Sequence, residues 1–198
     1  MKRRSFIRNI SSLGLASVAV GTSFAAETPQ SNSLPGKSKI PVYDGWDVIV
    51  VGGGPSGCAA ATAAKTLLME GTGALGGMGT SGLLNAWCPF TDGEKIIYKG
   101  IAERVFSESK KGVPHIHYDN WVPINGEYLK VVYDDLVTSE GVSVLFFTTM
   151  AAVEMKRKGV VDAIVVANKA GLSTYKAKVY IDCTGDGDLA AWAGADFV

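Results

Sequence analysis

The chain has 198 residues, no formal net charge, and a composition of 47% hydrophobic and 19% charged residues. This balance is typical of a globular protein with one sizeable core. Beyond the N-terminal segment no stretch concentrates lysine and arginine, which argues against a nucleic-acid partner because phosphate binding needs concentrated positive charge. The three cysteines, Cys58, Cys88 and Cys183, show no CxxC spacing, so the sequence supports neither a structural metal centre nor a disulfide framework.

Residues 1–26 are predicted to be an export signal. Basic residues within 2–8 precede a mildly apolar run at 10–21, which is too short to span a bilayer, and small residues at 23–26 offer a cleavage site. The stretch RRSFIR at 3–8 resembles a twin-arginine signal, with a general secretory signal as the alternative. We therefore expect export machinery to bind residues 1–26, and the mature protein to lie in a bacterial periplasm without a stable membrane anchor.

A change of composition predicts where the folded part begins. Residues 27–44 are polar and contain three prolines, which predicts a linker. Residues 45–198 are expected to form one domain. The β-branched run at 47–51 predicts its first strand, parallel to its neighbours and buried on both faces.

A glycine turn with the pattern GxGxxG follows this strand at 52–57. Gly52 permits the tight turn, Gly54 lets a pyrophosphate approach the backbone, and Gly57 lets a helix pack close to the strand. Pro55 suits the first turn of that helix, where free N–H groups attract an anion. The pattern predicts a dinucleotide-binding turn, with a glycine-rich loop of some other α/β protein as the alternative.

The helix after this turn is unusually short. A second strand is predicted at 66–69 and ends in Glu70, an acidic residue that can accept hydrogen bonds from both ribose hydroxyls. Crossing back along the first strand takes about eleven helical residues, 55–65, which leaves none for the next turn. We expect a deletion near the helix end, absorbed by fraying of the last helical turn or by a shift in strand register.

Two further signals carry a family resemblance. Glu70 followed by the doublet Gly76-Gly77 resembles the FAD-binding domain of the glutathione-reductase-type flavoproteins, in which the doublet leads past the pyrophosphate toward the flavin. A strand at 178–183 followed by TGDGD at 184–188 is similar to a hallmark of the same proteins, whose relatives include heterodisulfide-reductase-like flavoproteins. The segment 85–106 is similar too.

This resemblance implies an α/β fold, a Rossmann-like parallel sheet that binds FAD and carries a small antiparallel β insertion. It implies that the flavin exchanges hydride with a small-molecule substrate. The residues implied in cofactor binding are Gly52, Gly54, Pro55, Ser56, Gly57, Glu70, Gly76, Gly77, Met78, Thr184, Gly185 and Asp186.

The rest of the pattern agrees with that fold. Helical spacing predicts a helix at 126–138, and 142–147 is a strand expected to join the parallel sheet. A hairpin is predicted from 151–156 and 160–168 around a Lys-Gly turn, and another strand at 173–178.

Few residues offer chemistry of their own. Cys88 is either a redox or substrate-contacting thiol or, as we favour, a loop cysteine packed under Trp87 and Phe90. His115 and His117 have the HxH spacing of a metal site, but their turn-rich segment favours solvated side chains, so no metal is expected.

Two aspartates leave their role open. Asp186 and Asp188 either contact the ribitol or flavin, as the resemblance implies, or cap a helix that starts at Leu189. No general base is assigned, and the catalytic residues stay unknown.

The chain stops soon after TGDGD, whereas the resembled proteins continue much further. We therefore expect an incomplete FAD-binding domain, truncated at its C-terminus and without the substrate domain. The alternative to an oxidoreductase is an inactive remnant or a non-enzymatic dinucleotide-binding module. An NAD-dependent dehydrogenase is disfavoured by the Gly76-Gly77 doublet and TGDGD. Substrate, electron acceptor and oligomeric state are left undetermined.

Overall fold

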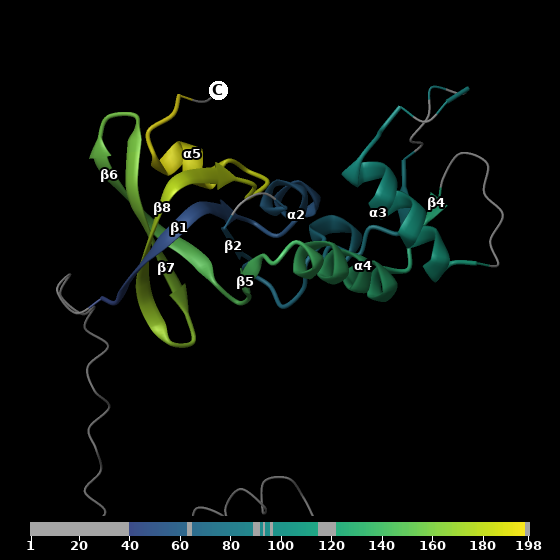
Figure 1. Cartoon of the computed structure of the whole chain (residues 1–198), viewed down its shortest axis with the longest axis horizontal. Coiled ribbons are helices and arrows are strands. Elements are labelled where there is room, and N and C mark those ends of the chain that lie inside the picture. The colour runs from purple at the N-terminus through teal and green to yellow at the C-terminus, as the bar shows by residue number, and fades with distance from the viewer. Residues whose placement is uncertain are drawn as a thin grey trace, which may run out of the picture. The chain divides into compact units, whose positions relative to one another are not determined.

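A six-stranded sheet forms the centre of the computed structural model (Figure 1). In sheet order its strands are β5 (Ser143–Leu145), β2 (Thr66–Met69), β1 (Val42–Val51), β8 (Gly171–Asp182), β7 (Val160–Asn168) and β6 (Thr149–Arg157). The neighbouring strands β5, β2, β1 and β8 pair in parallel. Strand β7 pairs antiparallel with both β8 and β6. This confirms the predicted Rossmann-like sheet with a small antiparallel insertion.

The structure describes residues 40–62, 65–88, 92, 94–95, 97–114 and 122–196. Three parts of the chain lie outside this range: the predicted export signal at 1–26, most of the predicted linker, and the segment with His115 and His117. Within it, no helix combines the length and the apolar character needed to cross a bilayer.

Apolar side chains fill both faces of the sheet. Along β1, Val50 belongs to one buried cluster, while Ile49 and Val51 belong to the other, as the two-residue period of a strand dictates. The first cluster packs against the helices α2 (Pro55–Ala61), α3 (Ile101–Ser109) and α4 (Gly126–Ser139). The second includes Ile164 of β7 and Leu189 of α5 (Asp188–Trp192). Burial on both faces explains the continuous apolar sequence at 48–51, the last part of β1.

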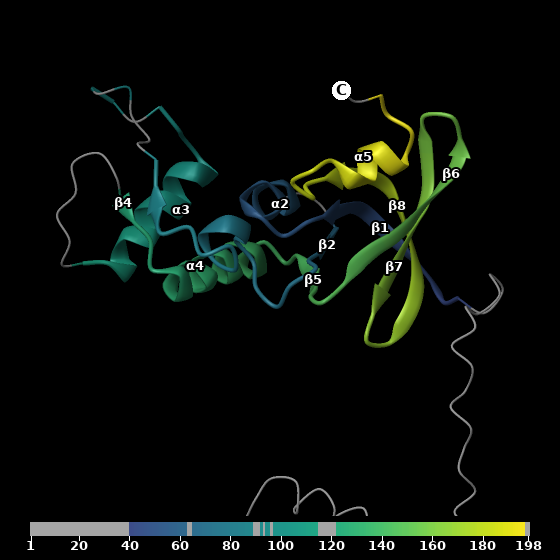
Figure 2. The same cartoon turned by 180° about the vertical axis from the view of Figure 1, so that it is seen from behind.

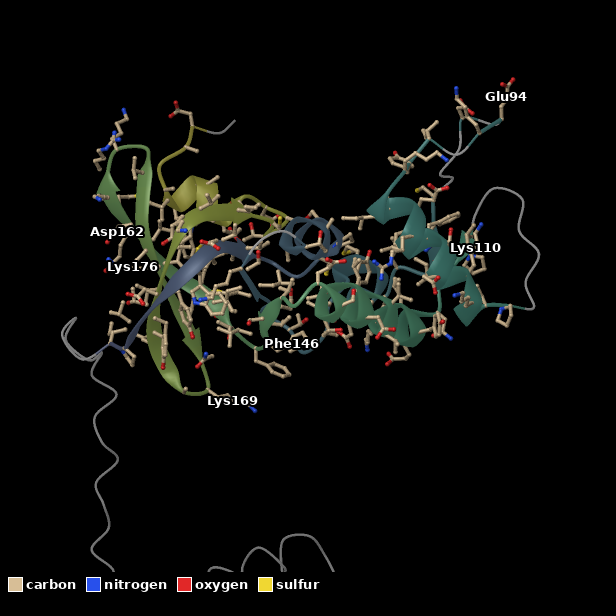
Figure 3. All side chains as sticks on the ribbon, in the orientation of Figure 1. Glu94, Lys110, Phe146, Asp162, Lys169 and Lys176 are labelled. Carbon is tan, nitrogen blue, oxygen red and sulfur yellow. The ribbon has the colours of Figure 1, made fainter. Side chains whose placement is uncertain are left out.

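The antiparallel insertion is continuous with the parallel sheet. Its last strand, β8, runs unbroken for 12 residues, where the sequence had suggested two strands that met near Lys178. The first part of β8 pairs with β7, and the part from Thr174 onward pairs with β1. An ion pair of 2.8 Å between Lys176 of β8 and Asp162 of β7 spans this junction (Figure 3).

The first strand begins earlier than expected. Val42 already pairs with Thr174, so β1 starts inside the segment predicted as linker at 27–44. The Tyr43 ring stacks on the Tyr175 ring with centroids 5.0 Å apart. Such cross-strand pairs stabilise a sheet, which explains why the polar end of this segment is ordered as strand.

Helix α2 is shortened, which leaves room for the turn into β2 despite the short connection between β1 and β2. It has seven residues and ends at Ala61 instead of continuing to Lys65, which confirms the shortened last turn. Val48 pairs with Thr66 and Val51 with Met69, so β1 and β2 end level with each other. Glu70 therefore follows β2 directly beside the glycine turn that follows β1.

A small lobe completes the described fold. It contains α3, the N-terminal half of α4, and a two-stranded sheet of β3 (Ala86–Trp87) and β4 (Val122–Pro123) that the sequence did not predict. Figure 2 shows this lobe, from behind, on the opposite side from the β6–β7 hairpin. α4 begins where predicted because the Asn125 side chain accepts a hydrogen bond of 3.1 Å from the Tyr128 N–H.

Candidate cofactor-binding site

The glycine turn has the shape that its motif predicts. A Cβ atom on Gly52, whose φ is +101°, would lie 2.1 Å from the Cys183 carbonyl oxygen, and one on Gly57 would lie 1.8 Å from the Gly52 carbonyl oxygen. Neither position has room for a side chain. A Cβ on Gly54 would have no atom within 4 Å, so this side of the turn is open to a ligand. No side chain caps α2, which leaves the N–H groups of Ser56 and Gly57 without a side-chain acceptor.

The Glu70 carboxylate is held between two backbone N–H groups. Its Oε2 accepts a hydrogen bond of 2.7 Å from Gly53, and its Oε1 accepts one of 2.7 Å from Thr72. Each carboxylate oxygen can accept more than one hydrogen bond. The arrangement fixes the carboxylate next to the glycine turn and leaves lone pairs for ligand hydroxyls.

The Gly76-Gly77 doublet lies against the same turn. The Gly76 N–H donates to the Gly53 carbonyl over 2.9 Å. A Cβ on Gly77, whose φ is +52°, would lie 3.2 Å from the Gly54 Cα, so the close approach of the two backbones depends on glycine at position 77. Met78, which follows, is 62% exposed. Three of the predicted groups are thus brought together: the turn, Glu70 and the doublet.

The TGDGD loop is organised by an aspartate that sequence analysis overlooked. Asp182 Oδ1 accepts hydrogen bonds from the Thr184 N–H and hydroxyl, and Oδ2 accepts one of 2.8 Å from the Ala190 N–H. The Thr184 hydroxyl oxygen in turn accepts from the Asp188 N–H. The N-cap residue of α5 is Gly187, which has no side chain, and no side chain makes a capping hydrogen bond there. Asp188 lies inside the first turn, so the capping alternative for Asp186 and Asp188 was wrong.

We predict that Asp182 couples the stability of this loop to pH. Burial raises the pKa of Asp182, but hydrogen bonds from Thr184 and Ala190 lower it by more than burial raises it. The pKa of Asp182 therefore lies below its ordinary value of 3.8. A lowered folded-state pKa means that the stabilisation is complete above the unfolded-state value and is lost as pH falls through the folded-state value. Asp182→Asn is therefore expected to cost about 1–2 kcal/mol at pH 7 and progressively less in acid.

Urea unfolding at pH 7 and in acid measures this. Asp135→Asn is the control, because the Asp135 carboxyl is exposed on α4. This substitution should change the free energy of unfolding at neither pH. If Asp182→Asn loses the same stability at every pH, the ionised carboxylate is not what orders the loop.

A cavity of about 320 Å³ opens at the carboxyl ends of the parallel strands. We call it the carboxyl-end cavity. Its lining includes Gly52, Glu70, Thr148, Thr149, Met150, Thr184, Asp188 and Trp192. Ligands of open α/β sheets bind at this edge, and the volume lies in the usual range for small-molecule sites.

The cavity contains residues that sequence analysis missed. Thr148 is attached to the site because its N–H donates to the Glu70 carbonyl over 3.0 Å. Trp192 comes from α5 and is 49% exposed. The position of 148–150 just beyond β5, after residues 146 and 147, was a usable signal. Trp192 had none, because only the fold brings α5 to this edge. Gly185 and Asp186 were predicted, but both are exposed and neither lines the cavity.

A larger cavity, of about 510 Å³, lies at the amino-terminal ends of the same strands. Tyr43, Trp46, Leu67 and Ser143 line it, and it contains none of the predicted site residues. Ligands of open α/β sheets bind at the carboxyl ends of the strands, so a cavity at the amino-terminal ends is the weaker candidate for a cofactor site.

The cysteines form no redox pair in the described residues. Burial raises the pKa of Cys58 to about 12, and its Sγ donates to the Gly53 carbonyl, so this thiol is part of the core. Cys183 is half-buried, while Cys88 is exposed. Over the same residues, no three potential metal ligands lie together.

Solved structures resemble this chain in fold at low sequence identity. A geranylgeranyl bacteriochlorophyll reductase-like protein from Thermoplasma acidophilum matches with a TM-score of 0.54 and 20% identity over 78% of this chain and 43% of its own. The p-nitrophenol 4-monooxygenase PnpA from Pseudomonas putida DLL-E4 matches with a TM-score of 0.55 and 14% identity over 78% of this chain and 45% of its own. This chain thus spans less than half the length of either neighbour, and the likeness shows the fold alone.

A family model decides the identity. No curated protein matches the chain. The model described as FAD dependent oxidoreductase matches residues 47–198, which is the whole of the chain from the middle of β1 onward. That span contains the glycine turn, Glu70, the doublet and the TGDGD loop. The chain therefore belongs to the FAD dependent oxidoreductase family, whose cofactor is FAD.

Proposed function

We propose that this domain holds FAD in an extended form across the carboxyl edge of the sheet, as the cofactor domain of an enzyme that exchanges hydride with a small-molecule substrate. Glu70 would bind the adenosine ribose, and the carboxyl-end cavity beside it would take the adenine. The open face of Gly54 and the first turn of α2 would receive the pyrophosphate. Bound FAD supplies the hydride acceptor and donor, and the protein orients it.

The residues present fit this cofactor. The open space over Gly54 meets the requirement for close approach of a pyrophosphate to the backbone. The carboxyl-end cavity, at about 320 Å³, has room for a nucleoside. Thr184 closes the turn from the other side, since a Cβ on Gly52 would lie 3.0 Å from the Thr184 Cα.

One observation carries the proposal: the Glu70 carboxylate is fixed by two N–H groups at the edge of a cavity of nucleoside size. A free carboxylate would lose side-chain entropy when it binds a ligand, whereas Glu70 is already held in place. The family match favours this oxidoreductase role over the alternative of a non-enzymatic module.

Glu70→Gln tests the proposal. A glutamine amide presents one NH₂ group, which would face the N–H of either Gly53 or Thr72 and lose that hydrogen bond, and the negative charge toward the ribose disappears. We expect FAD affinity to fall by about tenfold or more, because hydrogen bonds to charged groups contribute about 1.5–3 kcal/mol. Quenching of flavin fluorescence during titration of the full chain measures this.

Glu103→Gln is the matched control, because Glu103 pairs with Lys99 on the exposed surface of α3. It should bind FAD like the unchanged chain. Equal affinity of Glu70→Gln and the unchanged chain would contradict the assigned role of Glu70. Failure of the unchanged chain to bind FAD at all would contradict the proposed function of this domain.

A further inference from the structure

A third cavity, which is apolar, lies between the helices on the other side of the glycine turn. Its volume is about 130 Å³. We call it the aromatic cavity. Its walls include Pro55 and Ala59 of α2, Trp87 of β3, Ala102 and Phe106 of α3, and Tyr133 of α4. None of these residues except Pro55 belongs to the cofactor site described above.

Hydrogen bonds hold two of its aromatic walls in place. The Trp87 indole N–H donates to the Ser109 hydroxyl oxygen over 3.0 Å, and that hydroxyl donates to the Phe106 carbonyl over 2.8 Å. The Lys110 ammonium lies 4.2 Å from the centroid of the Phe106 ring (Lys110 is labelled in Figure 3). The cavity is therefore bounded by fixed, flat surfaces, which suit a planar molecule.

Tyr133 supplies a polar group that the protein itself does not use. Its side chain is only 3% exposed, and its ring packs against Gly76, yet its hydroxyl has no hydrogen-bond partner in the described part of the chain. Within that part, no fully inaccessible side-chain polar atom lacks a partner, so this hydroxyl keeps some accessible surface. Tyr133 is also a lining residue of the aromatic cavity. Burial raises the pKa of Tyr133, so the hydroxyl stays a neutral donor.

An unpaired hydroxyl in an apolar environment is costly. A ligand that brings an acceptor into the cavity removes this cost. We propose that the aromatic cavity binds a small aromatic molecule that carries one hydrogen-bond acceptor, and that the Tyr133 hydroxyl donates to that acceptor.

The volume sets the size of this ligand. An engineered apolar cavity of about 150 Å³ binds benzene, so about 130 Å³ suits a single ring with a short substituent. The three fused rings of a flavin do not fit. The site is thus distinct from both the carboxyl-end cavity and the flavin.

The aromatic cavity borders the cofactor site through Pro55. This residue begins α2, and a Cβ on Gly77 would lie 3.4 Å from its Cδ. A ligand in the cavity would lie beside the doublet that the family resemblance places on the path to the flavin. That this ligand is the substrate of the enzyme rests on the proposed function. That the aromatic cavity binds such a ligand does not depend on the proposed function.

Two probes of similar size test the proposal on the full chain. Benzonitrile has a nitrile acceptor, and toluene has the same ring without one. We expect both to bind, as measured by ligand-observed NMR titration. Tyr133→Phe removes only the hydroxyl and should weaken benzonitrile binding about fivefold while leaving toluene binding unchanged. The nitrile stretching band of bound benzonitrile should also shift between the two proteins, because it reports the lost hydrogen bond.

Two more variants complete the test. Tyr43→Phe, far from the cavity on β1, should leave both affinities unchanged. Ala102→Leu should fill the cavity and abolish binding of both probes without changing FAD affinity. The proposal is overturned if neither probe binds the unchanged chain, if Ala102→Leu still binds them, or if Tyr133→Phe binds benzonitrile as before. Probe binding by a chain that takes up no FAD would support this site and count only against the proposed function.

Discussion

Gly54→Ala is expected to lower FAD affinity on the order of a hundredfold while costing at most about 1 kcal/mol of folding stability. Gly54 has φ −68° and ψ −175°, which alanine adopts without strain, and its Cβ would contact no protein atom within 4 Å. The small cost arises because alanine is a poorer N-cap residue than glycine. The added methyl group would occupy the space through which a pyrophosphate must approach the turn.

Flavin fluorescence titration and urea unfolding of the same preparation separate the two effects. A variant that unfolds at nearly the same urea concentration and binds FAD weakly fits the proposed geometry. A variant that binds FAD normally would show that the pyrophosphate does not lie over Gly54, even if the chain binds FAD elsewhere.

Gly57→Ala, in contrast to Gly54→Ala, is expected to act mainly on folding stability, with a loss of more than about 3 kcal/mol. The Cβ would lie 1.8 Å from the Gly52 carbonyl oxygen and 3.3 Å from the Cys183 Cβ. Both neighbours directly follow central strands, Gly52 after β1 and Cys183 after β8, so α2 itself must move away from the sheet. The better helix propensity of alanine, worth about 1 kcal/mol, does not offset such a displacement. A loss of this size is a large fraction of the stability of a typical domain.

Urea unfolding followed by circular dichroism measures this loss. Ala60→Gly in the same helix is the control and should cost only about 1 kcal/mol, the difference in helix propensity. If Gly57→Ala unfolds at the same urea concentration as the unchanged chain, α2 does not pack against the Gly52 carbonyl as closely as the structure shows.

The local signals were sufficient where neighbouring residues decide the conformation. The β-branched run before the glycine turn, the turn itself and Glu70 after the second strand all lie where the sequence predicted. The hairpin turn at Gly159, with φ +76°, and the turn at Gly171, with φ +103°, were also predictable, since glycine alone adopts such angles at little cost. These features depend on spacing, glycine and strand propensity within a few residues.

Other features required knowledge of distant partners. The start of β1 at Val42 depends on Thr174 and Tyr175, more than a hundred residues later. The continuity of β8 depends on two different strands, one along each part of its length. No periodicity within 27–44 or 171–182 contains that information.

The sequence by itself determined the cofactor class, through the glycine turn, Glu70, the Gly76-Gly77 doublet and TGDGD. Only the tertiary structure decided which groups surround the carboxyl-end cavity and the aromatic cavity: Trp192 reaches the first from α5, and Tyr133, with its unpaired hydroxyl, lines the second from α4. The physical reason is that a motif binds its ligand largely through its own backbone, whereas a cavity is formed by side chains from several elements. Its lining therefore depends on how those elements pack.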